Sequence, residues 1–219
     1  MKILNIMKFK YICNCKKNNF FNKSYTYWED RDVTTDELEI INFLDNKNDD
    51  KFKSILHIGI GNSYFAKKFS YNNKITGITI SQKEIQKAKS MNLSNYQFYL
   101  LDKYSIDFQK FMDKNKFDII VDTNLKSYSC CQVSFEFMFQ NILKSINLNG
   151  MLITSINGMK WFKNLKPKLS FSFKKFFFFK LKEVNGNKCN ILIPDELKKL
   201  SQKYNFEMSF DNKLCYLKK

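Results

Sequence analysis

The chain has 219 residues, of which 37 are Lys or Arg and 21 are Asp or Glu, so its formal net charge is +16. That length predicts one domain, or one domain with an extension, and a hydrophobic content of 44% excludes wholesale disorder. No apolar run approaches the roughly 18–20 residues of a membrane-spanning helix. Residues 1–9 lack the apolar block and cleavage site of a signal peptide, and six cysteines are too few for a disulfide framework, so a cytoplasmic location is expected.

Residues 1–50 are predicted to form an N-terminal arm followed by a capping helix, and residues 51–219 an α/β domain. The helix signal begins at Thr34, because a Thr followed three positions later by Glu37 forms a capping box. Leu38, Ile41 and Leu44 then give the spacing of a helix that packs on a core.

Five short β-rich runs follow, at 54–58, 74–80, 96–101, 117–121 and 151–156. Helical patterns separate several of them: one contains Phe65 and Phe69, one runs from 81 to 89, and one runs from 134 to 146. An Asn-Gly segment, 147–150, closes the last of these helices. Short strands that alternate with helices predict a mostly parallel sheet with helices on both faces.

The C-terminal third has a different pattern. Residues 176–184 form a strand candidate, and Pro194 opens a helix with acidic residues in its first turn. Two further strand candidates, 206–210 and 214–217, are interpreted as the two arms of a hairpin or as a strand end. The chain therefore ends in a β-α-β arrangement.

A glycine-rich turn, Gly59-Ile60-Gly61, lies between the first strand and its helix. Such a turn lets backbone N–H groups approach a ligand closely. A dinucleotide fingerprint needs a third Gly where this chain has Tyr64, and an acid at the end of the second strand, where it has Thr79. NAD and FAD are therefore disfavoured.

The order of motifs resembles that of class I S-adenosylmethionine-dependent methyltransferases, which have a Rossmann-like seven-stranded sheet. Residues 55–63 resemble their first motif, and 77–81 resemble the second-strand segment of the cyclopropane-fatty-acid-synthase branch, where Thr replaces the usual acid. Residues 98–102 resemble the third strand, whose terminal Asp faces the adenine. Residues 117–122 and 143–153 resemble the fourth strand and the helix, turn and fifth strand that follow.

The resemblance implies that S-adenosylmethionine binds at this sheet edge and that S-adenosylhomocysteine is the product. Gly59, Gly61 and Asn62 are expected to hold the methionine part, and Thr79, Ile80 and Asp102 to flank the ribose and adenine. The acceptor is expected to be a small or lipid-like molecule. The complete set of expected cofactor-binding residues is His57, Gly59, Ile60, Gly61, Asn62, Ser63, Thr79, Ile80, Asp102, Lys103 and Asp122. No residue is assigned a catalytic role.

Two positions depart from the family pattern, since His57 stands where the family has an acid and Ser63 where it has its last Gly. Three hypotheses remain for His57: a neutral imidazole bonded to nearby backbone, a contact to the methionine end of the cofactor, and a general base. Aromatic residues of the arm, Tyr25, Tyr27 and Trp28, either close over the cofactor or simply pack.

The end of the fourth strand and the segment after it, at the mouth of the expected site, contain four polar residues: Asp122, Asn124, Lys126 and Tyr128. Asp122 is either a cofactor contact, a general base or a strand cap. No Asn-Pro-Pro-Tyr or Asp-Pro-Pro-Tyr run follows this strand, which argues against amino-methylation of nucleobases or Gln.

The cysteines show no Cys-x-x-Cys pair, and His57 is the only histidine, so no metal site is predicted. Neither Cys130 nor Cys131 has specific support as a nucleophile.

A basic aromatic insert, residues 159–182, holds eight Lys and eight Phe or Trp residues. It is interpreted as a core strand with a solvated Lys face, a lid over the acceptor, or a surface for RNA or anionic membrane. The alternative function is therefore a non-catalytic Rossmann-like module that binds RNA or membrane. Arg31 is the only arginine in the chain, which disfavours selected phosphate recognition.

Overall fold

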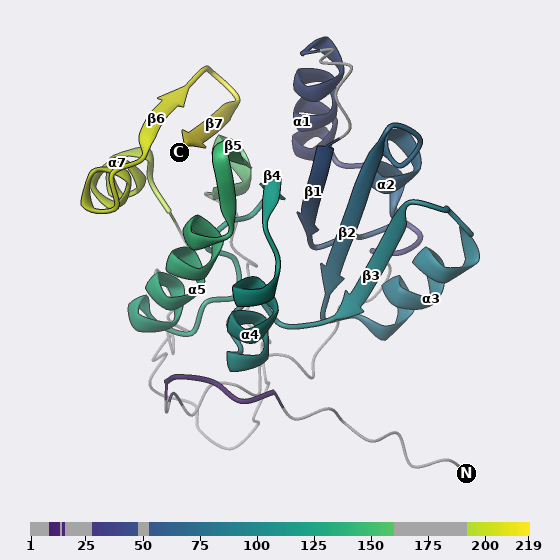
Figure 1. Cartoon of the computed structure of the whole chain (residues 1–219), viewed down its shortest axis with the longest axis horizontal. Coiled ribbons are helices and arrows are strands. Elements are labelled where there is room, and N and C mark those ends of the chain that lie inside the picture. Colours follow the sequence, from purple (N-terminus) through teal and green to yellow (C-terminus); the bar gives the residue numbers. More distant parts are fainter. Residues whose placement is uncertain (1–8, 14, 16–27, 48–52, 160–191) are drawn as a thin grey trace, which may run out of the picture.

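The computed structural model describes residues 9–13, 15, 28–47, 53–159 and 192–219, and these form a seven-stranded sheet with helices on both faces (Figure 1). The strand order is β3-β2-β1-β4-β5-β7-β6. β1 to β5 pair in parallel, whereas β7 runs antiparallel to both β5 and β6. The predicted fold class is confirmed. The strands are β1 Lys53–Ile58, β2 Asn73–Thr79, β3 Tyr96–Leu100, β4 Phe117–Asp122, β5 Ile146–Ser155, β6 Glu207–Phe210 and β7 Leu214–Lys218.

Side-chain caps begin several of the helices. Thr34 Oγ1 accepts the backbone N–H of Glu37, and Ser81 and Ser105 cap their helices in the same way. Only this half of the predicted capping box forms, because the Glu37 carboxyl group faces His57 instead. The helices are α1 Thr35–Asn46, α2 Tyr64–Phe69, α3 Gln82–Ser90, α4 Ile106–Lys114, α5 Gln132–Lys144, α6 Ile156–Met159 and α7 Pro194–Lys203.

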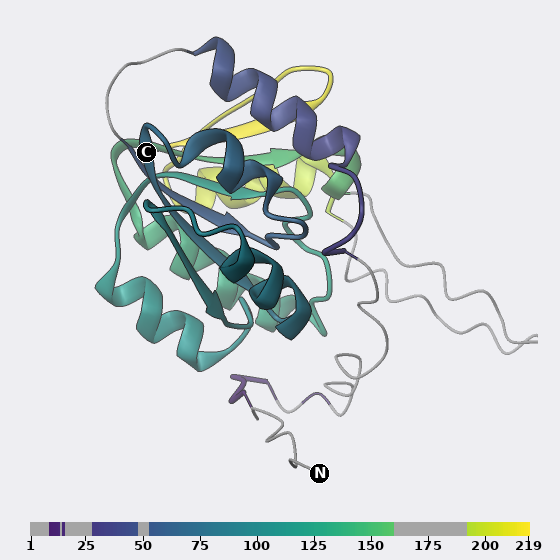
Figure 2. The same cartoon turned by 90° about the vertical axis from the view of Figure 1, so that its right-hand side faces the viewer.

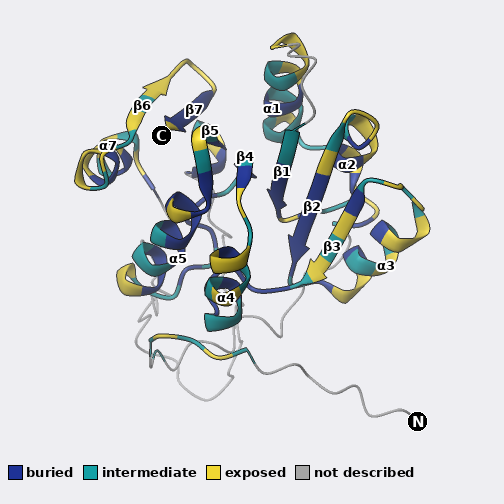
Figure 3. Cartoon of the chain, viewed as in Figure 1, coloured by how far each residue is buried: buried dark blue, intermediate teal, exposed yellow. Residues whose placement is uncertain are grey.

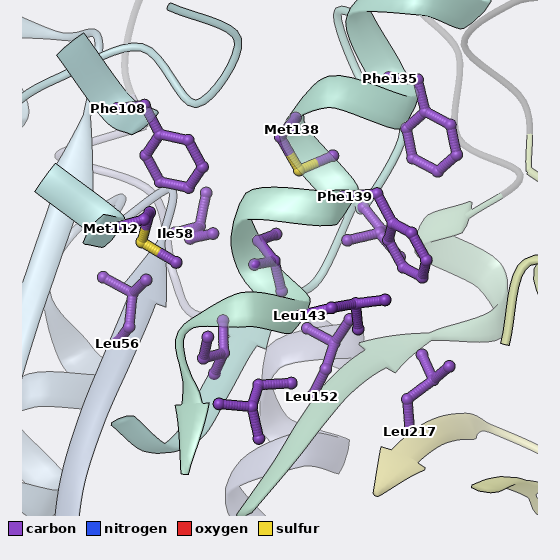
Figure 4. Close-up of a cluster of buried hydrophobic side chains, with 14 of the residues drawn as sticks. Leu56, Ile58, Phe108, Met112, Phe135, Met138, Phe139, Leu143, Leu152 and Leu217 are labelled. Atoms are coloured by element: carbon purple, nitrogen blue, oxygen red, sulfur yellow. The ribbon is translucent and has the colours of Figure 1, made fainter. Parts of the chain in front are cut away.

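Two hydrophobic cores lie on opposite faces of the sheet. On one face α4, α5 and α7 bury residues such as Phe108 and Phe139 against Leu56 of β1 (Figure 4). On the other face α1, α2 and α3 cover residues such as Ile55. Alternate residues of β1 therefore enter different cores, as strand geometry requires. Figure 2 shows α1 and α4 on opposite sides of the sheet. In Figure 3 the central strands β1 and β2 are mostly buried, whereas the edge strands β3 and β6 carry exposed residues.

β5 is longer than the sequence predicts. The strand begins at Ile146 rather than at residue 151, because the Asn-Gly segment is absorbed as an irregularity in the pairing with β4. Asn149 takes a positive φ of 65°, and the Asn147 side chain donates to Asp118 Oδ1 at 2.8 Å. The segment bends without leaving the sheet, so the expected turn before the fifth strand was wrong.

Two predicted features lie outside the described residues: nearly all of the basic aromatic insert, with the strand candidate at 176–184, and the boundary predicted between residues 50 and 51. The division into an arm and a domain stays a prediction. Ser155 Oγ of β5 donates to Asp36 Oδ1 of α1 at 2.7 Å, so the capping helix packs directly on the sheet. In the described ranges, every helix is too short or too polar to cross a bilayer.

Candidate functional site

A cavity of about 820 Å³ opens where β1, β2, β3 and β4 end. Open parallel sheets bind ligands at these carboxyl ends, where loops instead of side-chain layers cover the strands. Segment 28–37 of the arm and α1 forms one wall. The lining residues are Trp28, Asp30, Arg31, Asp32, Val33, Thr34, Thr35, Asp36, Glu37, Ile58, Gly59, Gly61, Asn62, Ile78, Thr79, Ile80, Glu84, Leu101, Asp102, Lys103, Tyr104, Asp122, Thr123, Asn124, Ser127 and Tyr128.

The glycine-rich turn forms the floor between β1 and α2. Gly59 and Gly61 have φ values of +82° and +49°, a region that side chains with a Cβ rarely adopt. The Gly59 N–H donates to Ile78 O at 2.8 Å, which ties the turn to β2. The Asn62 side chain donates to Arg31 O at 2.6 Å and thereby joins the turn to the arm.

Glu84 is a buried acid that the sequence interpretation missed. Its Oε2 accepts the Thr79 hydroxyl at 2.6 Å and the Gly61 N–H at 3.1 Å. Burial raises the pKa of Glu84 to about 7 against these two hydrogen bonds, which lower it. The carboxyl group lies between the glycine-rich turn and the end of β2, where the sequence offers only Thr79. Its sole sequence signal was its place in the first turn of α3.

His57 lies beneath the cavity, not in its lining, and is 1% exposed. Burial lowers its pKa to about 4, so the imidazole is neutral near pH 7. The ring packs on Phe65 with centroids 4.6 Å apart, and Nδ1 has no hydrogen-bond partner. The expected bond from a neutral His57 to nearby backbone is therefore absent at Nδ1.

Glu37 is the nearest acid to His57, with its Oε1 4.0 Å from His57 Nε2. This oxygen is buried, has no hydrogen-bond partner, and belongs to a residue that lines the cavity. Burial raises the pKa of Glu37 to about 7, with a smaller contribution in the same direction from the charge of Glu84, against a backbone hydrogen bond from Phe65. An acid from α1 thus lies beside the position where the family pattern has one on β1.

The Glu37→Gln substitution is expected to stabilise the ligand-free protein at pH 8 and to change little at pH 4.5. Because the pKa of Glu37 is raised from 4.5 to about 7, the folded state holds this proton more tightly than the unfolded state. The contribution of the protonated Glu37 carboxyl group to the free energy of unfolding is fully present below pH 4.5. It falls as the pH rises through 7 and is absent at pH 8. Removing the buried charge should add about 2–3 kcal/mol at pH 8, measured by urea unfolding at both pH values.

The matched control is Glu39→Gln on the same helix, which removes a partly exposed ion pair with Lys213. It should change the free energy of unfolding by less than about 1 kcal/mol at either pH. A Glu37→Gln gain that is equal at the two pH values would contradict the assignment of a buried, ionising carboxyl group.

Asp102, just after β3, is 2% exposed and fully engaged within the protein. Its Oδ1 accepts the Tyr104 N–H at 2.9 Å, and its Oδ2 accepts the Tyr11 hydroxyl at 2.9 Å. Burial raises the pKa of Asp102 despite these bonds and the nearby Lys103. The arm is thus attached to the third strand through Tyr11.

Lys103 and Asp122 form a buried ion pair at the ends of β3 and β4. Lys103 Nζ donates to Asp122 Oδ2 at 2.7 Å and to the carbonyl oxygens of Asn124 and Leu125, both at 3.1 Å. Asp122 Oδ1 also accepts the Asn124 N–H at 3.2 Å, so the carboxylate and Lys103 together hold the loop after β4 in place. This favours the strand-cap interpretation over a general base.

The predicted cofactor residues divide into two groups. Eight line the cavity, whereas His57, Ile60 and Ser63 are buried behind it, with Ser63 Oγ 3.1 Å from the Tyr96 hydroxyl oxygen. The eight lining residues are Gly59, Gly61, Asn62, Thr79, Ile80, Asp102, Lys103 and Asp122.

The other residues expected near the cavity also fall into two groups, those that line it and those that do not. Asn124 and Tyr128 line the cavity, but Lys126 points away and pairs with Glu196 of α7 at 2.6 Å. Trp28 lines the cavity, with the Arg31 guanidinium 4.2 Å from its ring centroid, whereas Tyr25 and Tyr27 lie outside the described residues.

The family described as "Methyltransferase domain" matches residues 49–208 of this chain. This span contains β1 to β5, the glycine-rich turn and α7. No curated protein matches the sequence.

Several solved structures share the fold at low sequence identity. N-methyltransferase NodS from Bradyrhizobium japonicum WM9, in complex with S-adenosyl-L-homocysteine, matches with a TM-score of 0.57 and 13% identity, over 85% of this chain and 89% of NodS. A putative caffeoyl-CoA O-methyltransferase from Staphylococcus aureus matches with a TM-score of 0.55 and 16% identity, over 86% of this chain and 85% of that protein. DhpI, in a complex with SAM and HEP, matches with a TM-score of 0.52 and 13% identity, over 84% of this chain and 85% of DhpI. At such identities the likeness establishes the fold alone.

Proposed function

The chain belongs to the methyltransferase-domain family, and from that premise we propose that it methylates a small, neutral or cationic acceptor with S-adenosylmethionine as the methyl donor. The observation that carries the acceptor class is the charge of the cavity. Seven carboxyl groups line it, against Arg31 and Lys103 as the cations, although the whole chain has a net charge of +16. Because Lys103 pairs with Asp122, and burial raises the pKa of Glu37 and of Glu84 to about 7, the negative excess in the cavity is largest above pH 7. Such a lining attracts cations and repels phosphate-rich molecules.

The residues present fit the proposed donor. The cavity volume of about 820 Å³ lies in the range of small-molecule sites, roughly 300–1,000 Å³. Gly59 and Gly61 leave the floor free of Cβ atoms, and nothing lies within 4 Å of a Cβ built at Gly59. Glu37 lines the cavity, and its carboxylate is a suitable partner for an ammonium group, such as that of the methionine part.

Each end of the donor has candidate partners in this arrangement. We assign Gly59, Gly61, Asn62 and Glu37 to the methionine part, so that Glu37 supplies from α1 the acid that position 57 lacks. Glu84, already held by Thr79, offers its carboxyl group to the ribose hydroxyls. Leu101, Asp102 and Lys103 would flank the adenine, with Lys103 contributing backbone and stem because its Nζ is engaged by Asp122.

The proposed reaction places few chemical demands on the protein. When bound, S-adenosylmethionine supplies an activated methyl group, which an acceptor atom attacks in line with the departing sulfur. The chain's residues orient the two reactants and exclude water. An amine acceptor that binds as an ammonium cation first loses a proton to solvent and then attacks through the freed lone pair, so no strong general base is needed. This agrees with Asp122 being held by Lys103.

Melting of the protein with and without S-adenosylmethionine or S-adenosylhomocysteine tests the donor site. At about 100 times Kd, either ligand should stabilise the fold by roughly 2.7 kcal/mol, or about 5–10 °C for a chain of this size. The shift should persist between about 50 and 200 mM salt, whereas a phosphate-driven contact loses about 10³-fold or more in affinity over that range.

Glu37→Gln serves as the matched variant, because it should melt higher than the wild type without ligand and yet show the smaller ligand shift at pH 8. A folded wild type that shows no shift with either ligand would refute the donor site and favour the RNA- or membrane-binding alternative.

Once a ligand-induced shift has been measured, the acceptor class is tested with a panel of amines, phenols and carboxylates, each assayed for S-adenosylhomocysteine release. Preference for anionic acceptors would overturn it.

A further inference from the structure

Four cysteines from two distant segments meet beside the cavity. Cys13 and Cys15 come from the arm, and Cys130 and Cys131 from the loop between β4 and α5. All four Sγ atoms lie within 4.8 Å of one another, and none of these cysteines is in a disulfide in the structure. Cys13 and Cys130 are separated by 117 positions in the sequence, yet their Sγ atoms are 3.0 Å apart.

Backbone and side-chain bonds hold the arm in this place independently of the cysteines. Tyr11 forms an antiparallel bridge with Ser105, and the Ile106 N–H donates to Lys10 O at 2.8 Å. The Tyr11 hydroxyl donates to Asp102 Oδ2 at 2.9 Å. In Figure 1 this segment is drawn in purple, below α4 and α5. The convergence of the four thiols therefore follows from docking of the arm against the start of α4.

We propose that Cys13, Cys15, Cys130 and Cys131 bind one Zn²⁺ ion. Four sulfur ligands at the usual Zn–S distance of about 2.3 Å form a tetrahedron with S···S edges of about 3.8 Å. The Sγ atoms of Cys130 and Cys131 are 3.8 Å apart, those of Cys13 and Cys130 are 3.0 Å apart, and no two of the four Sγ atoms are more than 4.8 Å apart. A single ion fits at the centre with small side-chain adjustments.

The chemistry of the cluster selects the metal. Thiolates are soft ligands, which favour zinc over magnesium, calcium or manganese. Cys131 is also the N-cap of α5, and its Sγ accepts the Ser134 N–H at 3.4 Å. This hydrogen bond fixes the Cys131 Sγ at the start of α5, within 4.8 Å of the other three Sγ atoms.

The ion would fasten the arm to the loop after β4. Ser127 and Tyr128 of this loop line the cavity, and the arm reaches Asp102 through Tyr11. The site would thus be structural, closed by four protein ligands, and distinct from the residues assigned to the methyl donor.

The test titrates the reduced, metal-free full chain with Co²⁺ as a spectroscopic probe and then with Zn²⁺. We expect one Co²⁺ per chain with a thiolate-to-cobalt charge-transfer band, displaced by one equivalent of Zn²⁺. Cys13→Ser and Cys131→Ser should each weaken binding about 100-fold, since each removes one of four ligands. Cys215→Ala, which alters a buried cysteine in β7 outside the cluster, should bind as the wild type does.

The outcomes are separable from those of the proposed function, because metal content is measured without donor or acceptor. A folded, fully reduced wild type that gives no charge-transfer band would overturn the proposal, and so would unchanged affinity in both cluster variants. Intact mass of the protein, purified without reductant or chelator, gives a further readout. A Cys13–Cys130 disulfide in place of bound zinc would also overturn the proposal. If the variants fail to fold, the wild-type titration decides alone.

Discussion

Gly61→Val is expected to weaken S-adenosylmethionine binding by about 100-fold or more while leaving a folded protein. Gly61 has a φ of +49°, where a β-branched residue is strained by roughly 1–2 kcal/mol. A Cβ built at this position meets nothing closer than Trp28 O at 3.7 Å, so the ligand-free fold has room for it. The added methyl groups would occupy the cavity floor, and a shifted backbone would withdraw the Gly61 N–H from Glu84. Calorimetric titration measures the loss.

Asn149→Val is the matched control, because Asn149 also has a positive φ, +65°, but lies in β5 away from the cavity. It introduces a similar backbone strain and should reduce the melting temperature to a similar extent without changing ligand affinity. Unchanged affinity in Gly61→Val would remove the glycine-rich turn from the donor site. Equal losses in the two variants would attribute the effect to stability.

Asp122→Asn is expected to destabilise the protein by about 3–5 kcal/mol, which corresponds to a fall of about 10 °C in melting temperature. The side chains of Lys103 and Asp122 are 9% and 3% exposed. The substitution removes the charge that pairs with the buried ammonium group and leaves it with neutral acceptors alone, among them the carbonyl oxygens of Asn124 and Leu125. Urea unfolding at pH 7.5 measures the cost.

An exposed pair of the same kind provides the comparison. Lys110 and Asp107 lie 3.3 Å apart on α4, with side chains 66% and 46% exposed, so Asp107→Asn should cost less than about 1 kcal/mol. The double variant Lys103→Met, Asp122→Asn should recover part of the loss because it no longer buries an unpaired charge. Equal costs for Asp122→Asn and Asp107→Asn would show that the buried pair is not needed for stability.

The elements that could be predicted from the sequence are those with local signals. The β-rich runs, the glycine-rich turn and the polar residues at strand ends all depend on neighbouring residues in the chain. The helix at Ile106–Lys114 was not identified, although Ser105 caps it and Phe108 and Met112 share its buried face. The start of β5 was misplaced because Asn and Gly residues usually end elements, whereas here they form an irregularity within one.

The acids of the site could not be predicted in the same way. Glu37 and Glu84 lie on helices whose amphipathic patterns say only that they are surface elements. Their carboxyl groups reach the glycine-rich turn and His57 through packing of α1 and α3 on the sheet. The cysteine cluster could not be predicted for the same reason, since a search for Cys-x-x-Cys cannot find ligands that lie 117 positions apart.

The position of β7 has a consequence for folding of the protein. Among the described residues, Leu214–Lys218 is the last strand in sequence order, yet it lies inside the sheet, between β5 and β6. Until β7 pairs, β5 presents an open row of backbone hydrogen-bonding groups on that side, and β6 has no partner strand. Folding intermediates that lack β7 therefore expose an aggregation-prone edge. We expect aggregation during refolding to start from these intermediates, before β7 is inserted between the two strands.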